Sequence, residues 1–202
     1  MKRIIALIAV SGALLLAGCS QVGVAASMGS TKITQATVQT SVDAVLAERA
    51  KVNTSAMQLE TGAALNRSQL RFHLMAALLN DVAADGKLSV TKAEVDARRA
   101  SIITQVGGAA ALPKALVGAG IASRDLDNYL QLIILSEKLS QAAIASGVTQ
   151  ANTGLEIQKL IVAKAAKEKV TINPRYGKWN AVTGDIVPAD AASSAATPAK
   201  TP

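Results

Sequence analysis

The segment from Ser123 to Ser146 is apolar around almost its whole circumference, and this constrains the fold more than any other part of the chain. A helix at a protein surface carries one apolar stripe, whereas a helix that is apolar on most sides lies within a core or lines a groove. Asp125 and Asp127 stand at its start, where carboxylates favour the positive end of the helix dipole. The apolar positions are Leu126, Tyr129, Leu130, Leu132, Ile133, Ile134, Leu135 and Leu139.

The remainder of the chain between residues 30 and 170 also predicts helices. Apolar residues recur at helical spacing, and glycines interrupt the pattern. The expected helices cover about residues 34–46, 66–84, 91–106, 112–117 and 153–169, in addition to 123–146. Capping boxes are predicted at Asn66 with Gln69, Thr91 with Glu94, and Thr153 with Glu156. Gly86 is expected in the left-handed conformation that ends a helix.

Two short β-branched or alternating segments flank these helices, at about residues 22–28 and 170–172. Neither is stable alone, so we expect them to pair and join the ends of the chain. The predicted fold is mainly α, with five to six helices in a bundle-like domain and a small two-stranded sheet that pairs the N- and C-terminal segments. Residues 19–187 would form this domain, and residues 188–202, rich in Ala, Ser, Thr and Pro, would stay disordered.

The N-terminus has the features of an export signal. Lys2 and Arg3 precede an apolar run from Ile4 to Ala17, which is shorter than the roughly twenty residues of a membrane span. The run ends in Leu16-Ala17-Gly18-Cys19, which resembles the lipobox of bacterial lipoproteins. We therefore expect cleavage of residues 1–18, lipidation of Cys19, and an extracytoplasmic domain anchored to the outer leaflet of the cell membrane. The host's outer membrane is an alternative location if the host is Gram-negative, and an ordinary signal peptide that ends near a cysteine is the competing interpretation.

The composition argues against a nucleic-acid partner. The formal net charge is +7 for the whole chain, but the sequence holds only one Phe, one Trp and two Tyr. Few aromatic rings are then available to stack on bases, and export separates the protein from nucleic acid. The basic excess is more typical of a solvated surface or of contact with anionic lipid.

No catalytic, metal or cofactor site is expected. His73 is the single histidine and Cys19 the single cysteine, so a zinc site lacks ligands. Asp81 and Asp85 lie four residues apart near a helix end, where carboxylates usually face solvent. No serine stands in a recognisable triad context with His73.

The order of the elements resembles the N-terminal domain of SurA-like and PrsA-like extracytoplasmic chaperones. The residues that carry the resemblance are 90–96 (VTKAEVD), 119–121 (AGI) with 125–130 (DLDNYL), and 172–179 (INPRYGKW). This resemblance implies a helical domain with paired ends and an apolar groove that holds unfolded exported chains. Complete members carry a parvulin isomerase domain before the last helix. Here only residues 147–152 separate the last two helices, so the isomerase is missing.

The resemblance and the apolar surplus together predict a membrane-anchored, ATP-independent holdase whose partners are unfolded or exported polypeptides. An envelope assembly factor that binds one folded partner is the alternative, and a residual prolyl isomerase is a third hypothesis. Flexible or broad side chains suit a groove that accepts varied sequences. Taken one by one, however, the same side chains would more often fill the core. The predicted client-binding residues are Met57, Phe72, Met75, Leu79, Tyr129 and Leu132.

Overall fold

The computed structural model describes residues 22–189, and it is mainly helical, as predicted. Its six α-helices are α1 (Gln35–Arg49), α2 (Gly62–Asp85), α3 (Lys92–Gln105), α4 (Leu112–Ala119), α5 (Leu126–Ala145) and α6 (Thr153–Lys167). The strands are β1 (Val24–Met28), β2 (Thr31–Thr34), β3 (Thr171–Ile172), β4 (Lys178–Asn180) and β5 (Asp185–Val187). The predicted signal peptide, Cys19 and the final residues of the predicted tail lie outside the described residues.

The two ends of the domain pair in a sheet of strand order β2-β1-β3. Ala26 stands opposite Ile172 and Ser27 opposite Thr171 in an antiparallel register, and the hydroxyls of Ser27 and Thr171 lie 2.7 Å apart. The predicted pairing of the ends is therefore confirmed. The sheet has three strands rather than two, because residues 31–34 form β2 in a hairpin with β1 before the first helix begins.

A second sheet, β4 with β5, was not predicted. The turn between its strands is closed by Asn180, whose Oδ1 accepts hydrogen bonds from the backbone nitrogens of Val182 and Thr183. This local closure is the Asx-type turn that asparagine favours. The sheet packs beside α2, and Arg71 of α2 forms an ion pair with Asp185 of β5 at 2.8 Å.

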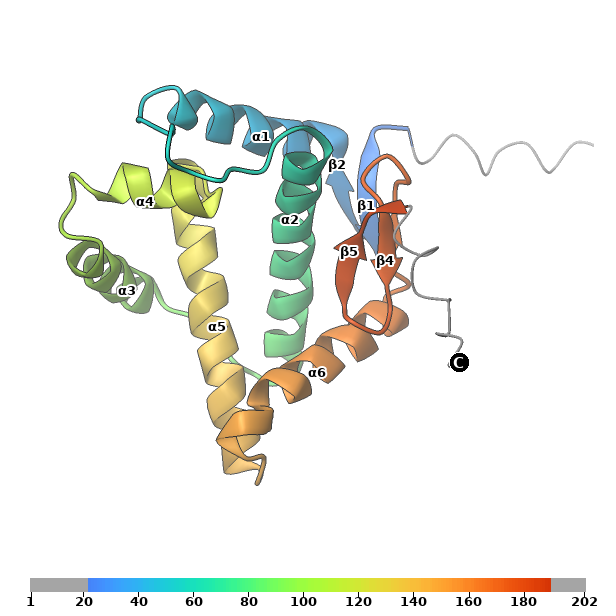
Figure 1. Ribbon diagram of the computed structural model, residues 1–202. Coiled ribbons are helices and arrows are strands. Elements are labelled where there is room, and N and C mark those ends of the chain that lie inside the picture. The colour runs from blue at the N-terminus through green and yellow to red at the C-terminus, as the bar shows by residue number, and fades with distance from the viewer. Residues whose placement is uncertain (1–21, 190–202) are drawn as a thin grey trace, which may run out of the picture.

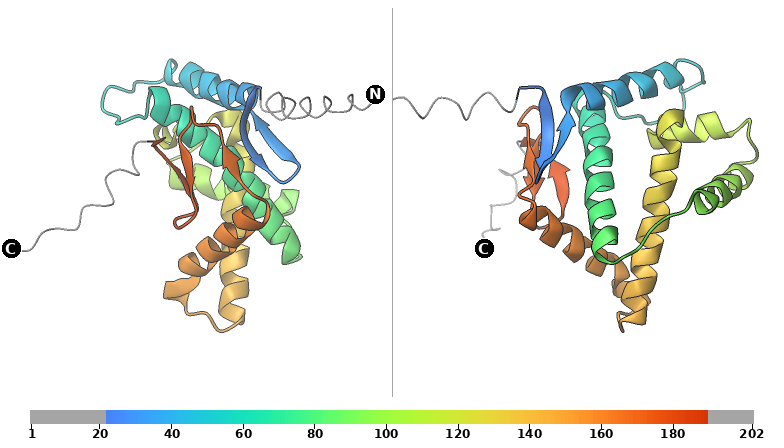
Figure 2. Two further views of the ribbon diagram at one scale, coloured as in Figure 1. Left: turned by 90° about the vertical axis from the view of Figure 1, so that its right-hand side faces the viewer. Right: turned by 180° about the vertical axis from the view of Figure 1, so that it is seen from behind.

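Two upright helices organise the helical layer (Figure 1). In this view α2 and α5 stand beside one another, α1 crosses above them and α6 crosses below. The strands lie beyond α2, whereas α3 and α4 lie beyond α5 (Figure 2). Among the described residues no helix is both long and apolar enough to cross a bilayer.

The larger hydrophobic core surrounds α2. Leu70, Leu74 and Leu78 form a stripe at helical spacing on this helix, and all three are fully buried, at 0 % exposure. The stripe packs with residues of α1, α6 and both sheets, whereas a smaller core joins α4 to the start of α5 around Leu116, Leu126 and Leu130. The outer helix α3 has no buried residue. The elements on the α2 side of the helix pair are therefore well buried, whereas α3 and α4, on the α5 side, are more exposed.

One of the three predicted capping boxes forms in the structure. Thr91 and Glu94 form the predicted capping box, in which each side chain accepts from the other residue's backbone nitrogen. The box at Asn66 is wrong, because α2 already begins at Gly62 and Asn66 donates to the Gly62 carbonyl inside the helix.

The box predicted at Thr153 and the predicted conformation of Gly86 are wrong too. A 3-10 turn, η3 (Gln150–Asn152), precedes α6, and the Thr153 hydroxyl donates to the Gln150 carbonyl. Gly86 has φ −81°, and the next residue, Lys87, takes the left-handed conformation with φ +55°.

Candidate functional site

Four of the six predicted client-binding residues line one hollow between α2 and α5. Phe72 and Met75 come from α2, and Tyr129 and Leu132 come from α5. The hollow has a volume of about 280 Å³, and we call it the Phe72 hollow. Its other lining residues are Glu60, Ser68, Gln69, Arg71, Ala119, Gly120, Ile121, Ala122 and Asp125.

The other two predicted residues lie elsewhere. Leu79 is only 8 % exposed and belongs to the larger core. Met57 lies in the connection between α1 and α2 and does not line the Phe72 hollow. For Leu79, the alternative that these side chains fill the core is the one that the structure supports.

The Phe72 hollow also contains two buried polar side chains, Gln69 and Asp125, which were not predicted as site residues. Gln69 is 5 % exposed, and its amide nitrogen donates to the Gly120 carbonyl at 2.9 Å. Asp125 is 6 % exposed and lies in the 3-10 turn η2 (Ser123–Asp125) that leads into α5. It stands at the start of α5, where it was expected, but its side chain makes no cap hydrogen bond to that helix.

A short chain of hydrogen bonds joins Asp125 to the single histidine. The Ser41 hydroxyl lies 2.8 Å from His73 Nε2 and donates to Asp125 Oδ2 at 3.5 Å. Because a carboxylate only accepts, the serine proton points to Asp125, and His73 Nε2 must then donate to the Ser41 oxygen. Burial lowers the pKa of His73 below its usual 6.5, against the opposing attraction of Asp125.

This chain does not form a catalytic triad. In a triad the carboxylate orients the histidine and the histidine activates the serine. Here the carboxylate contacts the serine, and Ser41 is 1 % exposed, so no substrate reaches its oxygen. The three residues instead link α1, α2 and η2 behind the Phe72 hollow.

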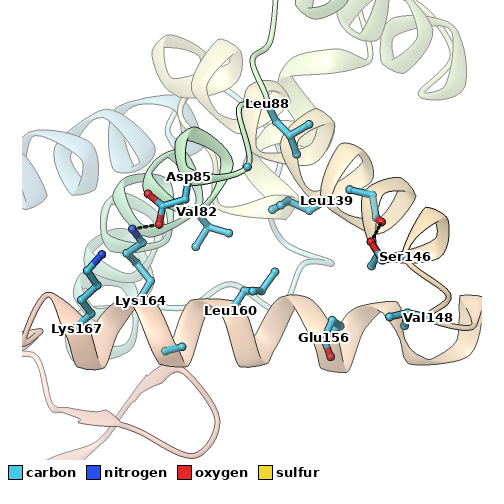
Figure 3. Close-up of a pocket in the computed structure, with 14 residues that line it drawn as sticks. Val82, Asp85, Leu88, Leu139, Ser146, Val148, Glu156, Leu160, Lys164 and Lys167 are labelled. Atoms are coloured by element: carbon cyan, nitrogen blue, oxygen red, sulfur yellow. Dashed lines mark hydrogen bonds and ion pairs between the residues drawn. The ribbon is translucent and has the colours of Figure 1, made fainter.

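A second hollow lies farther along the same helices, where α2 and α5 meet α6 (Figure 3). It has a volume of about 540 Å³ and we call it the Leu160 hollow. Its larger apolar lining residues include Val82, Leu88, Leu139 and Leu160. The remaining lining residues are Asp85, Gly86, Ala142, Ala143, Ser146, Val148, Glu156, Ala163, Lys164 and Lys167.

An ion pair closes one end of the Leu160 hollow. Lys164 of α6 is 8 % exposed, and its Nζ donates to Asp85 Oδ2 at the end of α2 (Figure 3). This hydrogen bond raises the pKa of Lys164 and lowers the pKa of Asp85. Asp85 faces solvent, as expected, with 63 % of its side chain exposed, and it also pairs with Lys164.

The sequence did contain a signal for this pair. Ile157, Ile161, Lys164 and Ala165 are the buried stripe of α6, and Lys164 follows Ile157 by seven residues, which is two helical turns. A lysine within an apolar stripe is rarely buried unless it is paired.

The two hollows lie on a common side of both helices. Met75 and Val82 are seven residues apart on α2, and Leu132 and Leu139 are seven residues apart on α5. Residues at this spacing lie on the same side of a helix, about 10 Å apart along its axis. An extended polypeptide covers that distance with about three residues.

The described residues contain no group of three or more His, Cys, Asp or Glu side chains placed to hold a metal ion. Comparison of the chain with protein-family models, curated proteins and solved structures gave no match. The resemblance to SurA-like chaperones therefore stays a prediction from the quoted motifs.

Proposed function

We propose that this protein binds apolar segments of unfolded polypeptides along the α2–α5 pair and holds them against aggregation at a membrane surface. The observation that carries the proposal is the gathering of Phe72, Met75, Tyr129 and Leu132 around one hollow. The two residues of α2 lie more than fifty positions from the two residues of α5 in the sequence. The Leu160 hollow, about 10 Å farther along, would hold a second apolar side chain of the same client.

The chemistry of the two hollows supports this function. Methionine and aromatic side chains adapt to varied partners, which suits a protein that holds many sequences. An exposed apolar side chain also lines the Leu160 hollow, since Leu160 itself is 40 % exposed. No step of this function requires a cofactor or a nucleotide.

Membrane attachment through Cys19 belongs to the same proposal. Five positions separate Cys19 from Val24, the first residue of β1, so a lipid on Cys19 would keep the domain close to the bilayer. Two acyl chains are needed for stable anchoring, and the diacylglyceryl group of a bacterial lipoprotein supplies them. Expression of a Cys19→Ser variant tests this part: the wild-type protein would sediment with membranes and label with palmitate, and the variant would do neither.

An aggregation assay tests client binding. The purified protein is added to a chemically unfolded client at the moment of dilution, and light scattering is followed. We expect scattering to fall at about equimolar protein, and no reduction at a several-fold molar excess would reject the proposal. A protein that instead captures a single folded partner, with no affinity for unfolded chains, would favour the assembly-factor alternative.

A matched pair of variants locates the site. Met75→Lys places a positive charge in the Phe72 hollow, whereas Leu155→Lys places the same charge at a residue that is 59 % exposed and lines neither hollow. The first variant should lose most of the protection and the second should keep it. Equal activity of both variants would place client binding outside the Phe72 hollow.

A further inference from the structure

The carboxylate of Asp125 is the buried charged group of the Phe72 hollow. It is 6 % exposed, yet its two polar contacts within the described residues are long. Ser41 Oγ lies 3.5 Å from Oδ2, and Arg124 Nε lies 3.7 Å from Oδ1. Charge-assisted hydrogen bonds to a carboxylate are normally about 2.7–2.9 Å long. A buried anion held so loosely is costly and favours a cation that approaches more closely.

The groups around Asp125 suit a cation as well. The Gln69 amide nitrogen is engaged with the Gly120 carbonyl, which leaves its oxygen as an acceptor in the hollow. The rings of Phe72 and Tyr129 line the same space, and aromatic faces attract ammonium and guanidinium groups. Met75 and Leu132 provide apolar contact for the methylene stem of a long basic side chain.

The only lining cation of this hollow is already engaged. Arg71 forms an ion pair with Asp185 at 2.8 Å, and Glu60 adds a second carboxylate at the edge. The hollow therefore has an excess of negative charge, although the chain as a whole carries +7. Its volume of about 280 Å³ lies just below the roughly 300–1,000 Å³ of pockets for drug-sized ligands, which suits one side chain.

We propose that the Phe72 hollow selects a lysine or arginine side chain within an apolar client segment, with Asp125 as its counter-ion. This inference rests on the proposed binding of polypeptides and adds the chemistry that the site prefers. The preferred client is an apolar stretch with one basic residue, whose stem lies against Met75 and Leu132 and whose charge reaches Asp125. Apolar neighbours in the client would occupy the Leu160 hollow.

Three labelled peptides test the inference, and they share one apolar sequence but differ at the central residue. The residue is lysine, acetyl-lysine or methionine, and binding to the purified protein is measured by fluorescence anisotropy. We expect the lysine peptide to bind about ten-fold more tightly than the other two, which is the gain of one buried charge-assisted contact. Because the protein carries a positive net charge, it repels a basic peptide overall. A preference for the lysine peptide would therefore have to come from a local site.

Two variants assign the preference to one carboxylate. Asp125→Asn keeps the size of the side chain and an oxygen that accepts from Ser41, but it removes the charge. It should reduce the difference between the peptides to less than about two-fold, the residual expected of exposed charges. Asp127→Asn is the matched control, because Asp127 is exposed, pairs with Arg99 and does not line the hollow. It should keep the ten-fold preference.

Each outcome decides between the inference and the function on which it rests. Equal binding of the three peptides overturns the inference and leaves polypeptide binding intact. Failure of all three peptides to bind overturns both. A lysine preference that survives Asp125→Asn assigns the selectivity to another group and overturns the role of Asp125. If Asp125→Asn melts at a much lower temperature, the comparison of lysine with acetyl-lysine on the wild-type protein still decides the question.

Discussion

The Phe72 hollow and the Leu160 hollow share two helices but differ in how their charges are satisfied. In the Leu160 hollow, Lys164 and Asp85 are each other's partner. In the Phe72 hollow, Asp125 has only long contacts, and the nearby Arg71 is held by Asp185. The α2–α5 pair therefore presents two different apolar sites. We call the Leu160 hollow the closed hollow, because its buried lysine has a carboxylate partner, and the Phe72 hollow the open hollow, because its buried carboxylate lacks a close partner.

The difference has a topological origin. The Leu160 hollow forms where a third helix, α6, crosses the end of α2 and brings a lysine against Asp85. The Phe72 hollow is bordered instead by the connection from α4 to α5, whose short η2 turn buries Asp125 and supplies only Arg124, at the long distance of 3.7 Å. A crossing helix thus completes one site, whereas a connecting segment leaves the other incomplete.

The largest effect is expected from the buried side of α2, the helix on which both hollows depend. Leu78 is 0 % exposed on α2 and lies between Met75 and Val82 in the sequence. Leu78→Ala should lower the free energy of unfolding by about 2–5 kcal/mol, as removal of a fully buried leucine does. Urea unfolding at pH 7 measures the loss, and Leu155→Ala, at a 59 % exposed position, should change it by less than about 0.5 kcal/mol. A similar small change at Leu78 would mean that α2 does not hold the two hollows together.

A smaller effect is expected when the closed hollow is opened. Asp85→Asn leaves the buried Lys164 without its carboxylate, so stability should fall at pH 7, though less than in Leu78→Ala because Asp85 itself is largely exposed. Lys164→Met should cost less again, because it fills the same space and leaves no unpaired charge. A greater loss in Lys164→Met than in Asp85→Asn would contradict this account.

The pH dependence of that pair follows from its pKa shifts. The pKa of Asp85 is lowered from 3.8, so its contribution is complete above 3.8 and is lost as the pH falls through the folded-state value. The pKa of Lys164 is raised from 10.5, so its contribution is complete below 10.5 and is lost as the pH rises through the folded-state value. Between these limits the closed hollow should be insensitive to pH.

The open hollow can be closed by a single change at its edge. Asp185→Asn releases the guanidinium of Arg71, which lines the Phe72 hollow, while the asparagine oxygen still accepts from the Ile186 nitrogen. The freed cation should weaken binding of the lysine peptide about three-fold, the effect of an exposed ion pair. Binding of the methionine peptide should not change. Asp96→Asn, which breaks an exposed pair with Lys92, is the control.

The sequence predicts well those features that depend on residues close together in the chain, such as helix caps and apolar stripes. Thr91 and Glu94 cap α3 as expected because both partners lie within four residues. The spacing of Leu70, Leu74 and Leu78 in the sequence also indicates one apolar face of a helix, and the structure buries all three residues. Asn66 and Gln69 show where this fails: their spacing fits a cap, but Gln69 is buried against Gly120 and the helix begins a turn earlier.

The candidate site was predictable only in its apolar part. Phe72, Met75, Tyr129 and Leu132 were selected because broad and flexible side chains exceeded what one helical stripe requires. Asp125 was not selected, because a carboxylate at a helix start already has a local explanation in the helix dipole. Its burial depends on Ser41, which is 84 positions away, and no local pattern contains that contact.

The smallest predicted effect is a pH dependence of the stability that arises beside the Phe72 hollow and not in the Leu160 hollow. His73 donates through Ser41 to Asp125, and burial lowers its pKa from 6.5, so the unfolded chain takes up its proton at a higher pH than the folded one. Stability should therefore decline slightly as the pH falls from 7.5 to 5.5, a range in which the Asp85–Lys164 pair contributes constantly. Thermal unfolding of His73→Gln should show a flatter profile over this range, while Asp85→Asn should keep the wild-type slope. A steeper profile in His73→Gln would show that another group causes the decline, and the hydrogen-bond chain behind the Phe72 hollow would then not be its pH-sensitive part.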